Sequence, residues 1–406
     1  MKTASEAQPS RRIQGRCSWL EAGVLSLLVA VTLAACGGGG TDSAGVGSGG
    51  TGSFSVGTIT GFGSVIVNGQ RYDDSSASVS DEDGPRSRAD LRLGMVVTVQ
   101  GSIGATGTAT ASSIVFDSEL LGPVDQGSVN AGGKSFTILG QKVAVFAGTV
   151  FDAALPLGLS SVRAGQTLEV HGFLNPIANE VQASFIQPNS GTGKYKISGT
   201  VSGLQGGAQT FRIGAATISY AGLSGADLQG LSNGVLVKVR LAPVPPGATV
   251  GGQATRLRKN DPAVADSKKA EVEGVITAFV SPAQFSVGAV RVDASNASFQ
   301  GGSAALGLGA RVEVKGAFSA GTLVASQVKL ESPDAETEIE LEGPVSGLDA
   351  TAKTFSLRGV TVSYAGPVKF EKGSPADLRN GAKVEVKGRL APDRVMVVAT
   401  RIEFDD

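Results

Sequence analysis

Residues 380–388, which read NGAKVEVKG, set the pattern of the whole chain. A glycine turn leads into a strand in which valines alternate with charged residues, and a second glycine ends the strand. The same pattern occurs at residues 308–316, 164–172, 93–101 and 233–241, and only the last of these lacks the closing glycine. The opening glycines lie roughly 70 to 75 residues apart, and such a period is typical of repeated small domains.

Composition supports several β-domains and excludes some functions. The chain has 406 residues, which suits several domains, and Lys+Arg 35 balance Asp+Glu 36, so no basic field gathers nucleic acid. The 58 glycines beside many valines indicate short strands and tight turns, and aromatic residues at 5% leave little for stacking surfaces. Two cysteines and one histidine exclude a disulfide framework or a zinc cluster in the body of the chain.

Residues 1–35 are predicted to be an export signal. Arg11, Arg12 and Arg16 supply its positive region, and an apolar run of about 14 residues follows, which is too short to span a bilayer comfortably. A start codon assigned too far upstream would explain the long segment before this run.

The signal ends in Leu-Ala-Ala-Cys at residues 33–36, which resembles the lipobox of bacterial lipoproteins. The resemblance implies that Cys36 is the first mature residue and the lipid attachment site, with several acyl chains that give stable anchoring. Gly37 replaces the aspartate that retains enterobacterial lipoproteins in the inner membrane, so the outer membrane is the expected location. The alternative is an ordinary signal peptide with a chance cysteine. Residues 36–56 are predicted to be a flexible Gly/Ser tether that spans about 25 Å.

Five units of about five short strands follow the tether. Their predicted bounds are 57–120, 121–190, 196–258, 271–331 and 340–406. The number of strands and the single long excursion in each unit predict an all-β chain, a tandem array of small OB-like closed barrels, each compact by itself. One helical turn with a serine cap is expected after Ser224 and after Ser374. One phenylalanine recurs in four units and is predicted to be barrel core, with base stacking as the alternative: Phe136, Phe211, Phe285 and Phe355.

These repeated features resemble the bacterial DUF5666 domain. The shared motifs are Gly-x-Val/Ile at the start of a unit, Phe-x-Val/Ile/Leu before a glycine, Asp-Leu before the turn, and Gly-x-x-Val-x-Val-x-Gly. The likeness extends from Gly57 to Asp406, is clearest in units four and five, and is weakest in unit three. It implies an exported repeat protein with no established activity.

The sequence offers no catalytic, cofactor or metal residues. His171 occupies a strand position that sister units fill with long hydrophilic residues, so we expect a solvated surface histidine rather than a general base. The acidic loop from Asp73 to Asp83 is interpreted as a solvated turn, with loose calcium binding as the alternative, because it lacks the ligand spacing of an EF-hand. One tryptophan and four tyrosines argue against an aromatic glycosidase cleft.

The expected function is that of a non-enzymatic, lipid-anchored scaffold or binding protein of the cell envelope. Its expected partners are the membrane, through the anchor, and an envelope protein or polysaccharide, with no nucleic acid. One alternative is an OB-fold array that binds oligosaccharide or nucleic acid, which requires exposed aromatic rings or a basic groove. A less favoured alternative is an envelope hydrolase, which requires a polar cluster formed between units. A neutral surface with few pockets would support the scaffold.

Overall fold

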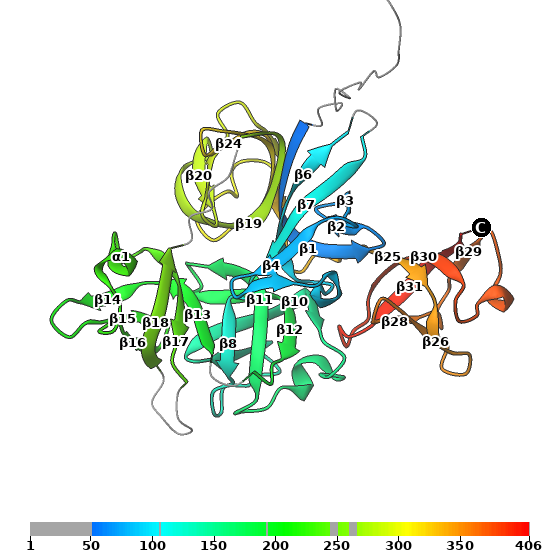
Figure 1. Ribbon diagram of the computed structural model, residues 1–406, viewed down its shortest axis with the longest axis horizontal. Coiled ribbons are helices and arrows are strands. Elements are labelled where there is room, and N and C mark those ends of the chain that lie inside the picture. Colours follow the sequence, from blue (N-terminus) through cyan, green and yellow to red (C-terminus); the bar gives the residue numbers. More distant parts are fainter. Residues whose placement is uncertain (1–50, 105–106, 192–193, 244–250, 260–265, 406) are drawn as a thin grey trace, which may run out of the picture. The chain divides into compact units, whose positions relative to one another are not determined.

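The computed structural model describes residues 51–104, 107–191, 194–243, 251–259 and 266–405 (Figure 1). The predicted signal and the predicted lipid site Cys36 lie outside these residues. Within them nearly all of the regular secondary structure is strand, and no helix there is long and apolar enough to cross a membrane.

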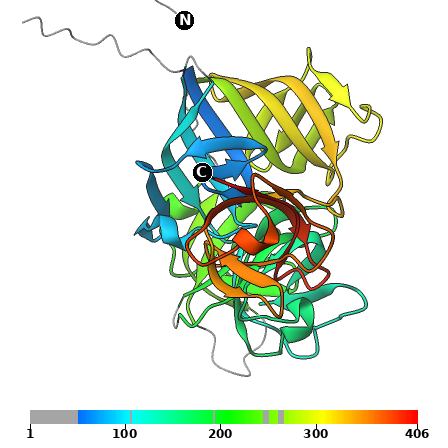
Figure 2. The same cartoon turned by 90° about the vertical axis from the view of Figure 1, so that its right-hand side faces the viewer.

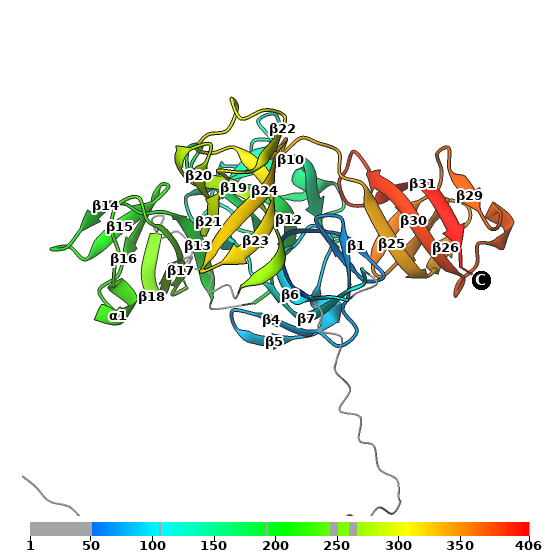
Figure 3. The same ribbon diagram turned by 90° about the horizontal axis from the view of Figure 1, so that it is seen from above.

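Barrel one contains five strands that close on themselves. They are β1 (Thr51–Phe62), β2 (Val65–Val67), β3 (Gln70–Asp73), β6 (Val96–Ile103) and β7 (Ala109–Phe116). The order around the barrel is β1-β2-β3-β7-β6 and back to β1; β3 and β7 are parallel, and the other pairs are antiparallel. A five-stranded barrel with this order is OB-like, as predicted. Figure 3 looks into this barrel (blue to cyan).

The hairpin of β4 (Ser78–Asp81) and β5 (Gly84–Arg86), followed by the 3-10 turn η1 (Arg88–Asp90), lies in the long excursion of barrel one. Strand β4 pairs in parallel with β7, whereas β5 pairs with β4 alone among the described strands.

The other four units repeat the same order. Barrel two has β8 (Leu120–Pro123), β9 (Ser135–Ile138), β10 (Gln141–Phe151), η2 (Gly158–Ser161), β11 (Thr167–Asn175) and β12 (Glu180–Pro188). Barrel three has β13 (Tyr195–Thr200), β14 (Ser202–Gln205), β15 (Thr210–Ile213), β16 (Ala216–Ser219), α1 (Gly225–Leu228), β17 (Leu236–Leu241) and β18 (Gly251–Lys259). Barrel four has β19 (Ser267–Ser281), β20 (Gln284–Val287), β21 (Val290–Asp293), β22 (Ser298–Gln300), β23 (Arg311–Ser319) and β24 (Thr322–Glu331). Barrel five, into which Figure 2 looks (orange to red), has β25 (Ile339–Pro344), β26 (Ser346–Asp349), β27 (Thr354–Leu357), β28 (Val360–Ser363), β29 (Lys369–Glu371), η3 (Pro375–Asp377), β30 (Lys383–Leu390) and β31 (Val397–Phe404).

The repeated motif explains this geometry. Its opening glycines have φ between 79° and 88°, a left-handed turn that residues with a side chain rarely adopt. In β30, Val384 and Val386 are fully buried, while the charged residues that alternate with them, Lys383, Glu385 and Lys387, face outward. The closing glycine lies at a β-bulge: a Cβ on Gly316 would lie 2.1 Å from the carbonyl oxygen of Val324 on β24.

The predicted core and caps are confirmed. The four recurrent phenylalanines, Phe136, Phe211, Phe285 and Phe355, are between 0% and 4% exposed. Helix α1 and turn η3 begin after the capping residues Ser224 and Ser374, each with a reciprocal capping box.

Each unit forms a barrel as predicted, but the barrels are not separate from one another, because first strands pair between them. In β1, residues 53–56 pair in parallel with residues 269–272 of β19, and Gly61 and Phe62 pair with β25. Strand β8 also pairs with β13, but in antiparallel orientation. The pairing joins barrels one, four and five into one sheet and barrels two and three into another. An exposed strand edge carries unpaired N–H and C=O groups, and here a sister barrel satisfies them.

The predicted tether extends too far, because β1 already begins at Thr51. Phe54 is 3% exposed and meets Phe318 of barrel four edge to face, with ring centroids 5.0 Å apart. This aromatic contact and the strand pairing together order residues 51–56.

Candidate functional site

A pocket of about 280 Å³ lies where barrels one, two and three meet. The β4–β5 turn, the segment between β7 and β8, and the strands β11, β12, β13 and β17 form its walls. Eleven of its lining residues are charged: Asp81, Glu82, Asp83, Asp90, Asp117, Glu169, Arg86, Arg92, Lys194, Lys196 and Arg240. This pocket differs from the surface with few pockets that we expected of a plain scaffold.

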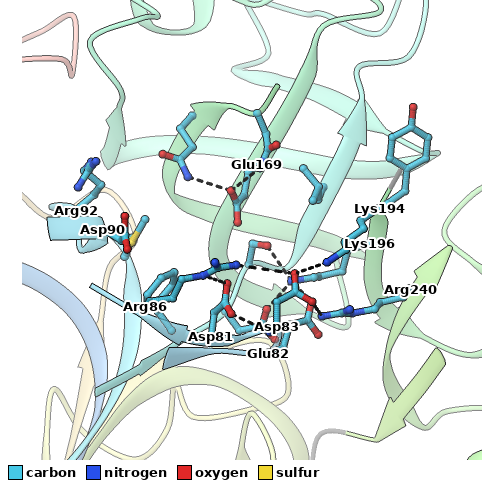
Figure 4. Close-up of a pocket in the computed structure, with 18 residues that line it drawn as sticks. Asp81, Glu82, Asp83, Arg86, Asp90, Arg92, Glu169, Lys194, Lys196 and Arg240 are labelled. Carbon is cyan, nitrogen blue, oxygen red and sulfur yellow. Dashed lines mark hydrogen bonds and ion pairs between the residues drawn. The ribbon is translucent and has the colours of Figure 1, made fainter. Parts of the chain in front are cut away.

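The acidic turn, defined as Glu82 and Asp83 between β4 and β5, projects toward barrel three (Figure 4). Asp81 shapes it: one carboxylate oxygen accepts hydrogen bonds from the backbone N–H groups of Asp83 and Gly84 at 2.8 and 3.1 Å, and the other accepts one from Arg86 at 2.7 Å. The interpretation of this segment as a solvated turn is therefore wrong at its tip, where the Glu82 side chain is only 7% exposed.

Cations of barrel three surround the acidic turn. Glu82 forms ion pairs with Lys196 and with Arg240, the latter at 3.3 Å, and Asp83 pairs with Arg240 and with Lys194 at 3.3 Å. Within the described part of the chain, no group of histidine, cysteine or acidic side chains is arranged to hold a metal ion. The carboxylates of Glu82 and Asp83, which the calcium alternative would use as ligands, are instead paired with lysine and arginine side chains.

The segment between β7 and β8 continues this network. Asp117 accepts from Lys196 at 2.5 Å and from Lys238 at 2.8 Å, and Glu119 lies 3.2 Å from Lys238. Burial opposes the ionisation of Asp117, but Lys238 and Lys196 outweigh it and lower its pKa to about 2. Burial likewise opposes the charge of Lys238, yet Glu119 and Asp117 raise its pKa above the ordinary value. The charges therefore stabilise one another across the junction.

His171 is completely buried, so the prediction of a surface histidine is wrong. Its ring lies between Phe116 of barrel one and Phe185, at centroid distances of 6.4 and 5.9 Å. Neither ring nitrogen has a hydrogen-bond partner, and Nε2 lies 3.7 Å from Glu169. Burial lowers the pKa of His171, and the nearby carboxylate of Glu169 opposes this only in part.

His171 is buried because of a contact between barrels, which could not be predicted from the sequence. In sister barrels the equivalent residues Gln100, Lys315 and Lys387 retain exposure, whereas the outer face of β11 packs against barrel one. The unusual residue type at this position was the one available signal.

Glu169 connects the histidine to the pocket. Burial raises its pKa, but His171 and the side-chain amides of Gln187 and Asn189, both 3.0 Å away, give a net lowering. Glu169 lines the pocket, whereas His171 is enclosed behind it and does not.

The sequence profile described as a domain of unknown function, DUF5666, matches residues 56–115, 122–187, 273–329 and 342–403. Together these segments cover more than half of the 406 residues. The chain belongs to this family. The matched DUF5666 segments correspond to barrels one, two, four and five; barrel three has the same strand order but lies outside them.

Other comparisons add little to the DUF5666 match. No curated protein matches the chain. Among solved structures, the chain is similar to one described as drosophila Unr CSD456, with 15% sequence identity over 53% of this chain and 98% of that chain. The TM-score of 0.13 is too low to carry an argument.

Proposed function

We propose that this DUF5666 protein is a non-enzymatic, lipid-anchored scaffold or binding protein of the bacterial cell envelope, located at the outer membrane. The observation that carries the proposal is the pairing of first strands between barrels, β1 with β19 and β25 and β8 with β13. Main-chain pairing fixes neighbouring barrels more firmly than flexible linkers would, as a scaffold requires.

The state of the charged pocket favours this proposal over a hydrolase. A hydrolytic site needs a nucleophile or general base that substrate can reach. Here Glu82, Asp83 and Asp117 are each engaged by cations, and His171 is enclosed. These contacts support a stabilising role for the pocket.

An OB-fold array that binds oligosaccharide or nucleic acid is the second candidate. The OB-like strand order favours it. Stacking surfaces require exposed aromatic rings, whereas the recurrent phenylalanines are at most 4% exposed. We therefore expect no nucleic acid as a partner, and an envelope protein or polysaccharide remains the proposed partner of the scaffold.

The anchor can be tested directly in cells. We expect radiolabelled palmitate to enter the wild-type protein and to be absent from a Cys36→Ser variant, with the variant lost from the outer-membrane fraction. Equal labelling of the two proteins would refute the anchor. Cross-linking in intact cells, followed by identification of the captured molecules, tests the scaffold: a single processed substrate in place of a bound partner would contradict it.

A further inference from the structure

The hairpin that carries the acidic turn distinguishes barrel one from its sisters. In barrels four and five the equivalent strands β22 and β29 pair in parallel with the last strand, as β4 does with β7. Neither is followed by a partner strand like β5 among the described residues. Barrels four and five close without an equivalent of β5, so the added strand and the acidic turn are not needed to close barrel one.

The surface that the acidic turn covers carries three positive charges. We name this surface the cationic strip and define it as Lys194, Lys196 and Arg240, from β13, β17 and the residue before β13. Along β17 the charges alternate with Val237 and Val239, which are 2% and 0% exposed, so the charged side chains point away from the barrel core.

The acidic turn is complementary to the cationic strip in both charge and shape. Glu82 enters a recess in which its own side chain is 7% exposed and that of Lys196 is 8% exposed. Asp83, the next residue, reaches Lys194 and Arg240 at the rim. Two adjacent carboxylates at two depths match a polypeptide, because short side chains can enter where a bulky sulfated or phosphorylated polymer cannot.

Outside this contact the β5 side of the covering segment is weakly held, whereas its β4 side pairs with β7. Strand β5 pairs only with β4, over three residue pairs, among the described strands. When the acidic turn leaves, Lys196 and Lys238 still form ion pairs with Asp117, so neither buried ammonium group is left without a partner. The cost of opening is therefore modest.

We propose that the cationic strip of barrel three is a docking surface for an acidic polypeptide segment, and that the acidic turn occupies it within the same chain. A partner must then displace a segment whose effective concentration is on the order of millimolar. The turn thus sets the affinity threshold for partners, and the proposal is independent of the lipid anchor.

The test uses the full chain and a synthetic fluorescent peptide with the sequence of residues 78–87. Its affinity is measured by fluorescence anisotropy for the wild type and for the double variant Glu82→Gln/Asp83→Asn. We expect the double variant to bind the peptide about tenfold more tightly than the wild type, because its own turn competes less. Adding Lys194→Gln and Arg240→Gln should abolish that gain.

Controls separate the outcomes. Glu371→Gln, on the equivalent strand β29, should bind the peptide as the wild type does. A peptide carrying Gln and Asn at positions 82 and 83 should not bind the double variant. The proposal is overturned if the double variant binds the natural peptide no better than the wild type does, while hydrogen exchange shows β5 released. If β5 stays protected in the double variant, the measurement is repeated with the variant Glu82→Lys/Asp83→Lys. Tighter binding of the natural peptide than by the wild type then supports the proposal, and equal or weaker binding overturns it. Tighter binding of dextran sulfate than of the peptide would also overturn it, because the surface would then be a general polyanion site.

Discussion

Glu271 of β19 is a buried carboxylate whose charge works against the fold. Its residue is 6% exposed, at the joint where β19 pairs with β1. Lys315 lies 2.7 Å away, but Glu313 also approaches the same ammonium group at 3.0 Å. Burial raises the pKa of Glu271 to about 7, with Lys315 opposing and Glu313 reinforcing the change.

We predict that Glu271→Gln stabilises the protein above neutral pH. Because the folded chain binds this proton more tightly, its contribution to stability is complete below the ordinary pKa of 4.5 and is lost as the pH rises through about 7. Denaturant unfolding should show the variant about 1 to 3 kcal/mol more stable at pH 8 and nearly equal to the wild type at pH 4. Glu331→Gln, which loses only a more exposed pair with Lys329, serves as the control. A variant less stable than the wild type at pH 8 would show that the pair with Lys315 dominates.

His171 predicts the opposite pH dependence. Its pKa is lowered by burial, so its contribution to stability is present above the ordinary value of 6.5 and declines as the pH falls. Because neither nitrogen has a partner, His171→Leu should cost less than about 1 kcal/mol at pH 7.5. Between pH 6.5 and 4.5 the variant should retain more of its free energy of unfolding than the wild type does. Parallel stability curves for the two proteins over this range would contradict the prediction.

At the scale of the element, the closing glycine of each motif is a packing requirement. The strands β6, β11, β23 and β30 all shift register at this glycine. Strand β17 has the same shift but carries Leu241, so its bulge tolerates a side chain. This difference agrees with the absence of a DUF5666 match over barrel three.

We predict that Gly316→Ala destabilises barrel four by about 1 to 3 kcal/mol, because the methyl group and the Val324 carbonyl oxygen would be only 2.1 Å apart. Gly307→Ala in the same barrel meets no atom within 4 Å and should be neutral or slightly stabilising. Thermal unfolding of both variants checks the pair. Equal effects would mean that loss of glycine flexibility, and not the bulge, decides the outcome.

The elements themselves were predictable because they depend on local rules. Period-two burial and glycine turns locate strands such as β30, and serine caps locate α1 and η3. The partners of β1 could not be predicted, because any exposed edge satisfies the same hydrogen bonds. His171 and Glu82 were misread for a related reason: equivalent positions in a repeat suggest equivalent exposure, whereas neighbouring barrels break that symmetry.

At the scale of the whole molecule, β1 makes three barrels depend on one strand. It belongs to barrel one through β6, to the sheet of barrel four through β19, and to that of barrel five through β25. Phe54 belongs to the apolar cluster of barrel four although its strand closes barrel one. Such sharing couples the unfolding of barrels that separate domains would undergo independently.

Phe54→Ala tests this coupling. The substitution removes an aromatic ring that is 3% exposed against Phe318, and we expect a loss of about 3 kcal/mol. Native-state hydrogen exchange should show reduced protection in both β6 and β23, while β17 of barrel three retains its protection. Val280→Ala on the same β19 that β1 pairs with, at a position 80% exposed, should leave all three strands unchanged. A loss confined to β23 would mean that β1 holds barrel one together without Phe54, and that the first strands join barrels that remain energetically separate.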